Sequence, residues 1–306
     1  MEFANKLLLH KNNRPQLLGM IKGIYDGLGL RYPFIEKDGT PLYDICPFTV
    51  FGCFNKGISN ESRIAIMKGI SNKLNVTAEV PTVFDGIPVL MPMRAWFFVG
   101  KNKRKADDIP NLWKVFEAGI NFADNPSEVS KTAFVNCYEK VRKQPGIKWN
   151  LTIGLYWIRP FSYLNLDELN RRYLAQEKSP YYNIITRISN LKQLPSAKTY
   201  LELISACKEF FAKHDSPHRS FPELSHAVWT QMTLGGQPPE AKDGGKTGKP
   251  GWIFQGNPKY YDVIGAVKNL DIISWDVKQY RNQIKKDDRA YIWVSGPGGG
   301  IVASGV

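Results

Sequence analysis

The sequence predicts an α+β protein with a helix-rich N-terminal region, a linker and a smaller β-rich C-terminal segment. Three observations indicate this. Before residue 233, apolar residues recur at helical spacing in several stretches. Residues 234–250 are rich in Gly and Pro and show no apolar periodicity, which is typical of a flexible linker. After the linker, short apolar runs alternate with turn residues. We therefore divide the chain into residues 1–233, 234–250 and 251–306.

Four helices of the N-terminal region are predicted from apolar residues three or four positions apart. Their apolar faces are Leu17, Ile21, Ile24, Tyr25 and Leu28; Ile109, Leu112, Trp113, Phe116 and Ile120; Phe134, Cys137, Tyr138 and Val141; and Tyr200, Leu203, Ile204, Cys207 and Phe211. Gly29 suits a C-cap of the first helix. Asp107 or Asp108 suits an N-cap of the second, and Ser196 an N-cap of the fourth.

Two strands and one further helix complete this region. Residues 149–158 alternate between apolar and other residues, which favours a strand with Trp149, Leu151, Ile153, Leu155 and Trp157 on one face. Residues 94–99 form a short apolar run that also favours a strand. Asp167 is predicted as the N-cap of a short helix whose Leu169 and Tyr173 pack inward.

The net charge of +13 is the strongest functional indication in the composition. A basic surface attracts nucleic acid or anionic membrane. Because no basic amphipathic helix is evident, nucleic acid is favoured over membrane, although a basic surface can also serve solubility alone. The basic residues are densest at 101–105 and 139–148. We expect Lys101, Lys103, Arg104 and Lys105 to contact the phosphate backbone.

The composition also bears on location. No run of eighteen apolar residues occurs, and the first residues do not resemble a signal peptide. The four cysteines are widely spaced and form no C-x-x-C pair, which is typical of a reduced chain with free thiols. The sequence therefore predicts a cytoplasmic protein without a membrane partner.

Two sequence motifs partly match a phosphate-binding loop and a metal site, but neither match is complete. The sequence GGKTGK at 244–249 lacks the glycine that a phosphate-binding loop needs five residues before Gly245, because Glu240 stands there. Three histidines lie near one another downstream of Cys207, but their spacing is loose and prolines interrupt the segment: His214, His218 and His226. We predict no catalytic residue, no metal site and no cofactor in this chain.

The C-terminal segment resembles the start of an EVE domain, a relative of YTH domains among the PUA-like β-barrels. The resemblance rests on WIFQGNPKYYDV at 252–263 and ISWDVKQYRNQIKKDDRAYIWVSGPGGGIVASGV at 273–306. Their order is a strand ending in Gly-Asn-Pro, a helix, a tryptophan-bearing turn, the segment IKKDDRAYIW, a Gly-rich hairpin and a returning strand at 301–304. Complete EVE domains are longer, so the resemblance implies a partial barrel in a fragment of a longer protein.

The resemblance also implies a binding site, since EVE and YTH relatives hold a modified base flipped into an aromatic pocket. By motif position the site comprises Gln255, Gly256, Asn257, Trp275 and Trp293. Flipping a base costs a few kcal/mol, and stacking on aromatic side chains returns about 1–3 kcal/mol per base. An asparagine amide can read the base edge, and Gly256 leaves room for a cavity. The alternative for Trp252 and Trp293, which lie in apolar strands, is burial in the core.

The N-terminal region is similar to the leading region of McrB-type proteins over roughly residues 2–230. The similarity is carried by EFANKLLLHKNNRPQLL, DICPFTVFGCFNKGISNESRIAIMKGI, FDGIPVL, GLYWIRPFSYLNLDELNRRYL and SFPELSHAVW. In that family a recognition region precedes an AAA+ GTPase that works with a McrC-type nuclease subunit. The resemblance implies GTP and Mg²⁺ as cofactors, and homo-oligomers, only if a motor domain follows residue 306.

Together these features predict recognition of modified DNA, a methylated or hydroxymethylated cytosine, by base flipping within a restriction system. Three alternatives remain open. The first is a modified-RNA-binding module, as some YTH relatives are. The second is an enzyme with an unrecognised N-terminal active site, and the third is an interaction scaffold without a base pocket.

Overall fold

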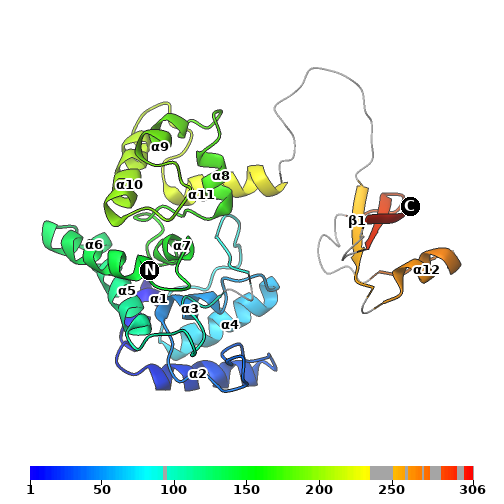
Figure 1. The fold of residues 1–306 in the computed structure, drawn as a ribbon, viewed down its shortest axis with the longest axis horizontal. Coiled ribbons are helices and arrows are strands. Elements are labelled where there is room, and N and C mark those ends of the chain that lie inside the picture. Colours follow the sequence, from blue (N-terminus) through cyan, green and yellow to red (C-terminus); the bar gives the residue numbers. More distant parts are fainter. Residues whose placement is uncertain are drawn as a thin grey trace. The chain divides into compact units, whose positions relative to one another are not determined.

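The computed structural model describes residues 1–91, 95–234, 251–258, 261–270, 272–275, 284–294 and 300–305. The chain divides into two compact units, Met1–Pro238 and Pro239–Val306. This division falls within the predicted linker, of which residues 235–250 lie outside the described residues. The first unit is helical and the second holds a small sheet, so the predicted helix-rich α+β class is confirmed (Figure 1).

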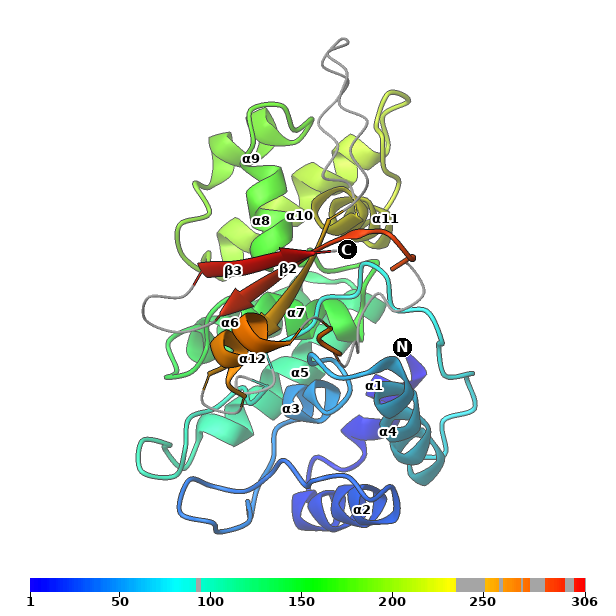
Figure 2. The ribbon, with the colours of Figure 1, turned by 90° about the vertical axis from the view of Figure 1, so that its right-hand side faces the viewer.

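The helices of the first unit form three tiers, seen from two directions in Figures 1 and 2: α8 to α11 lie at one end, α2 and α4 at the other, and α5 to α7 between them. Their bounds are α1 Glu2–Leu8, α2 Arg14–Gly27, α3 Pro47–Gly52, α4 Asn60–Lys73, α5 Asp108–Asp124, α6 Glu128–Arg142, α7 Asn150–Ile158, α8 Glu168–Leu174, α9 Tyr182–Ile188, α10 Ala197–Phe211 and α11 Phe221–Trp229, followed by a π-helical turn, Thr230–Leu234.

The four long helices predicted from periodicity are present as α2, α5, α6 and α10. Their predicted apolar faces are buried, apart from Leu28, which is 40% exposed, and Cys137, which is half-buried. The Ser196 side chain accepts a hydrogen bond from the Thr199 backbone N–H and caps α10 as predicted. Asp167 caps α8 in the same way, accepting from the Asn170 N–H. Asp107 occupies the N-cap position of α5, but its side chain makes no capping bond.

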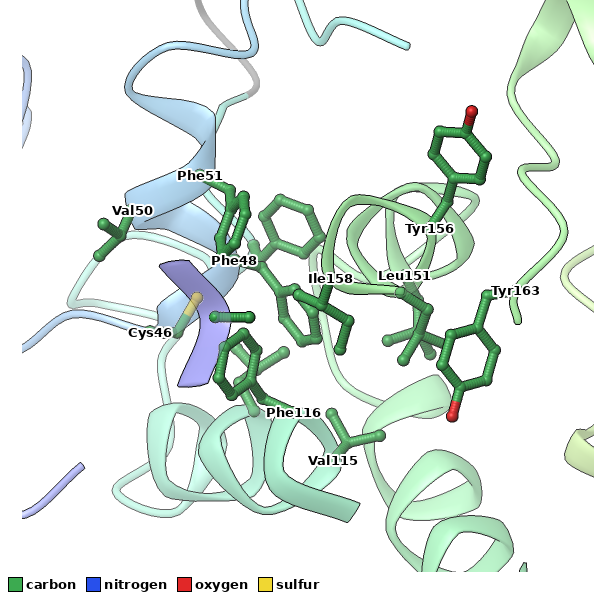
Figure 3. Packing of buried hydrophobic residues seen from close by; sticks show 14 of the residues in the cluster. Cys46, Phe48, Val50, Phe51, Val115, Phe116, Leu151, Tyr156, Ile158 and Tyr163 are labelled. Carbon is green, nitrogen blue, oxygen red and sulfur yellow. The ribbon is translucent and has the colours of Figure 1, made fainter. Parts of the chain in front are cut away.

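The core of the first unit forms where α3, α5 and α7 meet (Figure 3). Phe48 of α3 stacks on Phe97 and meets Phe116 of α5 edge to face, with ring centroids 5.2 and 5.5 Å apart. The indole N–H of Trp113 donates to the Ile45 carbonyl oxygen at 2.9 Å, so this large ring is buried without an unpaired polar atom. Gly154 lets α7 approach α3, because a Cβ there would lie 2.5 Å from Phe48 Cδ1.

The predicted strand at 149–158 is wrong, because residues Asn150–Ile158 form helix α7. Seven of its nine residues are buried, so α7 is apolar on nearly every side. A helix surrounded by core has no polar face, and its sequence shows no 3.6-residue period. The alternation of large apolar residues there reflects general burial and not the two faces of a sheet.

The predicted strand at 94–99 is also wrong for its described residues, 95–99, which belong to no strand. Its apolar residues are nevertheless core, since Phe97 and Phe98 are buried. The backbone N–H of Phe97 donates to Thr49 Oγ1 at 3.1 Å. A side chain of α3 therefore satisfies a backbone group that would otherwise need a strand partner.

The second unit contains β1 (Gly251–Gly256), α12 (Val263–Asn269), β2 (Arg289–Val294) and β3 (Gly300–Gly305), in the predicted order. Its sheet has the order β1-β2-β3, with β2 parallel to β1 and antiparallel to β3, and α12 lies beside the strands (Figure 2). The predicted hairpin at 295–299 lies outside the described residues. Within the part that is described the sheet is open, so the closed PUA-like barrel is not shown.

Candidate nucleic-acid interface

Trp275 packs directly against the end of β1. A Cβ built on Gly256 would lie 2.4 Å from Val263 Cγ2 and 3.0 Å from Trp275 Cη2, so only glycine allows this approach. The Phe254 ring lies 6.2 Å from the indole, tilted by 52°. Gly256 therefore seats the indole against the strand, and the space of its missing side chain is filled by Val263 and Trp275.

The register of the sheet separates the predicted site residues into two groups. Gly256 pairs with Val294, and Gln255 pairs with Trp293. Because successive side chains of a strand point to opposite faces, Gly256 and Val294 lie on the face that Trp275 covers, and Gln255 and Trp293 lie on the other. The structure thus brings Trp275 to Gly256 but does not bring it to Trp293, which is 39% exposed.

Asn257 stands exposed immediately after β1, and its backbone carbonyl accepts from the Tyr261 N–H at 3.2 Å. Trp275 itself is half-buried, so part of the indole faces outward. Asn257 therefore follows directly on the residue that seats Trp275. This strand end offers a surface for stacking and an amide that can donate to and accept from a base edge.

Trp252 has a different role. Its indole N–H donates to Asp288 Oδ2 at 2.7 Å, and the same oxygen accepts from the backbone N–H of Lys285 at 2.9 Å. The side chain is half-buried. Trp252 thus ties the first residues of β1 to the turn that precedes β2, which is a structural task.

In the first unit, residues of the basic stretch 139–148 contact residues that flank the basic stretch 101–105. Gly146 packs on the backbone near Val99, with its Cβ position 3.3 Å from Val99 Cγ1. Gln144 Nε2 donates to the Asp108 carbonyl oxygen at 3.4 Å. Two of the exposed lysines in these segments, Lys101 and Lys140, form ion pairs with Asp38 and Asp107. We call the other exposed lysines of these segments the basic surface; it consists of Lys103, Lys105, Lys143 and Lys148. Among the described residues, none of the four lies within ion-pair distance of a carboxylate.

The other two residues predicted to contact the phosphate backbone, Lys101 and Arg104, form ion pairs within the protein. Arg104 Nη2 lies 3.0 Å from Glu36 Oε1, and both side chains are almost completely buried. Lys101 pairs with Asp38 in the open, and this hydrogen-bonded contact holds the pKa of Asp38 at about 2. Lys103 and Lys105 therefore remain available from the predicted set. The packing of Gly146 on Val99 brings the segment of Lys143 and Lys148 next to that of Lys103 and Lys105. No local sequence pattern predicts this contact.

Comparison with known families places the first unit. Residues 1–231 match the family described as a domain of unknown function, DUF8425. The chain belongs to this family. No curated protein and no solved structure matches the chain. The DUF8425 domain thus spans the helical unit and its basic surface, and the match ends before β1.

The histidines of the DUF8425 domain do not gather around a metal. His218 is buried and its Nδ1 lies 2.9 Å from the Tyr181 hydroxyl, while His214 and His226 are exposed and Cys207 lies in the core. In the part of the chain that the structure describes, no three His, Cys, Asp or Glu side chains are placed to hold a metal ion. No helix among those residues is long and apolar enough to span a membrane.

Proposed function

We propose that the chain recognises DNA carrying a methylated or hydroxymethylated cytosine, which the C-terminal unit takes as a base flipped out of the duplex. The observation that carries this proposal is the half-buried indole of Trp275, seated on Gly256 beside the exposed Asn257. Stacking on such a ring returns about 1–3 kcal/mol, comparable to the cost of removing one base from the duplex. The Asn257 amide then reads the exposed base edge.

The DUF8425 domain contributes the sequence-independent part of the affinity in this proposal. Its basic surface presents four exposed lysines from two segments, and phosphate contacts of this kind release condensed counterions. Such contacts position a protein on nucleic acid without reading its sequence. The basic surface therefore holds the backbone, while Trp275 and Asn257 select the base.

The family resemblances extend the proposal to a biological setting. The order β1, α12, Trp275, β2 and β3 supports an EVE-type sheet that belongs to a PUA-like barrel. The resemblance of the first unit to McrB-type leading regions supports a role as the targeting part of a cytoplasmic, GTP-dependent restriction system. GTP and Mg²⁺ then belong to a motor domain, and the cutting partner is a McrC-type nuclease subunit.

The proposal is tested by fluorescence anisotropy with three labelled probes of one sequence: an unmodified duplex, a duplex with one 5-methylcytosine or 5-hydroxymethylcytosine, and single-stranded RNA. We expect tighter binding of a modified duplex. Trp275→Ala and Asn257→Ala should each abolish that preference, with a loss on the order of tenfold for the modified probe. Trp293→Ala, on the opposite face of the sheet, should retain it.

The lysines are tested on the same probes. Lys103→Ala combined with Lys143→Ala should weaken binding to both duplexes equally and reduce its salt dependence. Lys178→Ala combined with Lys192→Ala, an exposed pair outside the basic surface, serves as the matched control. Equal affinity of the wild-type chain for modified and unmodified duplexes contradicts the proposal, and tighter binding of the RNA favours an RNA-binding module instead.

A further inference from the structure

A cavity of about 520 Å³ lies in the DUF8425 domain among α1, α3, α4, α7 and α11, and neither the sheet nor the basic surface contributes to it. Its volume falls within the range of small-molecule sites. Aromatic rings form much of its wall: Phe3, Phe51, Phe54, Tyr156, Trp157 and Phe161. Phe51 and Trp157 stack with their ring planes only 12° apart, and the Trp157 indole N–H is anchored on the Pro88 carbonyl at 3.0 Å.

The segment 76–87, which we call the strap, forms one side of this cavity and is fastened at both ends. At one end the Glu2 carboxylate accepts from the backbone N–H groups of Thr77 and Ala78, at 2.9 and 2.8 Å. At the other end Ser225 Oγ donates to the Gly86 carbonyl at 2.7 Å. Gly86 has a φ of 74°, and a Cβ there would lie 2.4 Å from His226 Cα. The cavity wall is therefore held in place before any ligand binds.

The charge around the cavity is opposite to that of the whole chain. The strap brings the exposed carboxylates of Glu79 and Asp85 to its rim, and Glu2 adds a third. Backbone N–H donors on the strap lower the pKa of Glu2, so it is ionised at neutral pH. Among the described residues that line the cavity, none is Lys or Arg, and the cationic group is the α-ammonium of Met1. The three carboxylates outnumber it, so the lining carries a net negative charge. In a protein of net charge +13, this lining disfavours phosphates and favours a cation.

The inner side of the cavity carries two buried polar residues, Asn55 and Ser71. The Asn55 side-chain oxygen is taken by Arg63 Nη2 at 2.5 Å, so what Asn55 can offer a ligand is its amide N–H. Arg63 does not line the cavity; its guanidinium lies over the Phe84 ring, 3.9 Å from the centroid. A neutral oxygen acceptor on the ligand suits this inner side.

We infer that the DUF8425 domain binds a small organic cation in this cavity, with an ammonium group toward Glu79 and Asp85 and an apolar body against the aromatic rings. Aromatic faces attract organic cations, and nearby carboxylates add Coulomb attraction. The ligand is a free small molecule, because the cavity has the size of a small-molecule site and the strap is already fastened across it. This inference is independent of the proposed recognition of modified DNA.

The test is equilibrium dialysis of the whole chain against two compounds of nearly equal shape. Benzoylcholine carries the ammonium group and an ester oxygen, and 3,3-dimethylbutyl benzoate replaces the ammonium by a neutral carbon. We expect saturable binding of benzoylcholine, about tenfold tighter than that of its neutral counterpart. A peptide containing trimethyllysine, tested in parallel, should bind more weakly than benzoylcholine.

Variants locate the site. Glu79→Gln combined with Asp85→Asn should reduce the preference for the cation to about twofold or less. The matched control, Glu177→Gln with Asp215→Asn, makes the same change in net charge at exposed positions outside the cavity and should keep the preference. Phe161→Ala, at a side chain 61% exposed on the cavity edge, should weaken both compounds without unfolding the chain.

Four results would overturn the inference. They are the absence of saturable binding, equal binding of the neutral compound, equal loss in the matched control, and binding of the trimethyllysine peptide in preference to benzoylcholine.

Discussion

Replacing Glu36 tests whether a buried ion pair holds the loop that carries Lys103 and Lys105. Glu36 Oε1 lies 3.0 Å from Arg104 Nη2, and the two side chains are only 5% and 3% exposed. The second carboxylate oxygen accepts from the Lys101 backbone N–H at 3.3 Å. Glu36→Gln preserves the shape of the side chain, but it removes the negative charge that lies 3.0 Å from the buried guanidinium.

Breaking one side of a buried ion pair costs about 3–5 kcal/mol. For a unit of this size, each kcal/mol moves Tm by about 2–4 °C, so Glu36→Gln should lower the Tm of the first unit by roughly 6–20 °C. The matched variant is Asp38→Asn, which removes the exposed pair with Lys101 on the same loop. Solvent and salt screen an exposed pair, so this variant should lower Tm much less than Glu36→Gln does.

Thermal unfolding followed by far-UV circular dichroism measures both variants. The double replacement Glu36→Leu with Arg104→Met should melt closer to the wild type than Glu36→Gln does, because it removes both buried charges together. A loss for Glu36→Gln no larger than that for Asp38→Asn would refute the reasoning and return Arg104 to the set of free cations.

Three other expectations concern the DUF8425 domain. Gly154→Ala should lower the free energy of unfolding, measured in urea, by about 1–3 kcal/mol because its Cβ meets Phe48. Gly23→Ala meets nothing within 4 Å and should raise it by about 0.4–1 kcal/mol. Equal effects would contradict the packing described. Burial raises the pKa of the Cys46, Cys53 and Cys207 thiols to about 12, whereas Cys137 is only half-buried. Cys137 should therefore be the first cysteine alkylated at mildly alkaline pH, as peptide mass spectrometry would show, and earlier labelling of Cys207 would contradict this. Burial also lowers the pKa of His218, so the unfolded state binds a proton more readily and stability should fall as pH drops below about 6.5; the urea midpoint of His218→Gln should vary less with pH.

The helices that the sequence predicts well are those with one buried apolar face and one solvent-exposed polar face. Helix α10 has both an amphipathic pattern and a capping serine, and the structure reproduces both. Helix α7 was missed because nearly all its residues are buried, which removes the polar half of the pattern. Periodicity therefore identified α5 and α10, which keep a polar face, and failed at α7, which does not.

The candidate site shows a similar division. The resemblance to EVE domains implied a site that joins Trp275 to the end of β1, and the structure places the indole against Gly256. The cavity expected at Gly256 is instead filled by Val263 and Trp275. The separation of Trp275 from Trp293 depends on which residue pairs with which across β1 and β2, and the sequence does not state this register. Likewise, the sequence does not distinguish Arg104 from its basic neighbours, because its ion-pair partner, Glu36, is distant in the chain.

The proposed function requires that one flipped base docks at Trp275. The most direct measurement is the fluorescence of 2-aminopurine placed next to the modified cytosine in a duplex, because removal of the neighbouring base relieves its stacking. We predict that saturating protein raises this fluorescence several-fold on the modified duplex and that Trp275→Ala abolishes the rise. Tight binding with unchanged fluorescence, or an equal rise with Trp275→Ala, would contradict the claim.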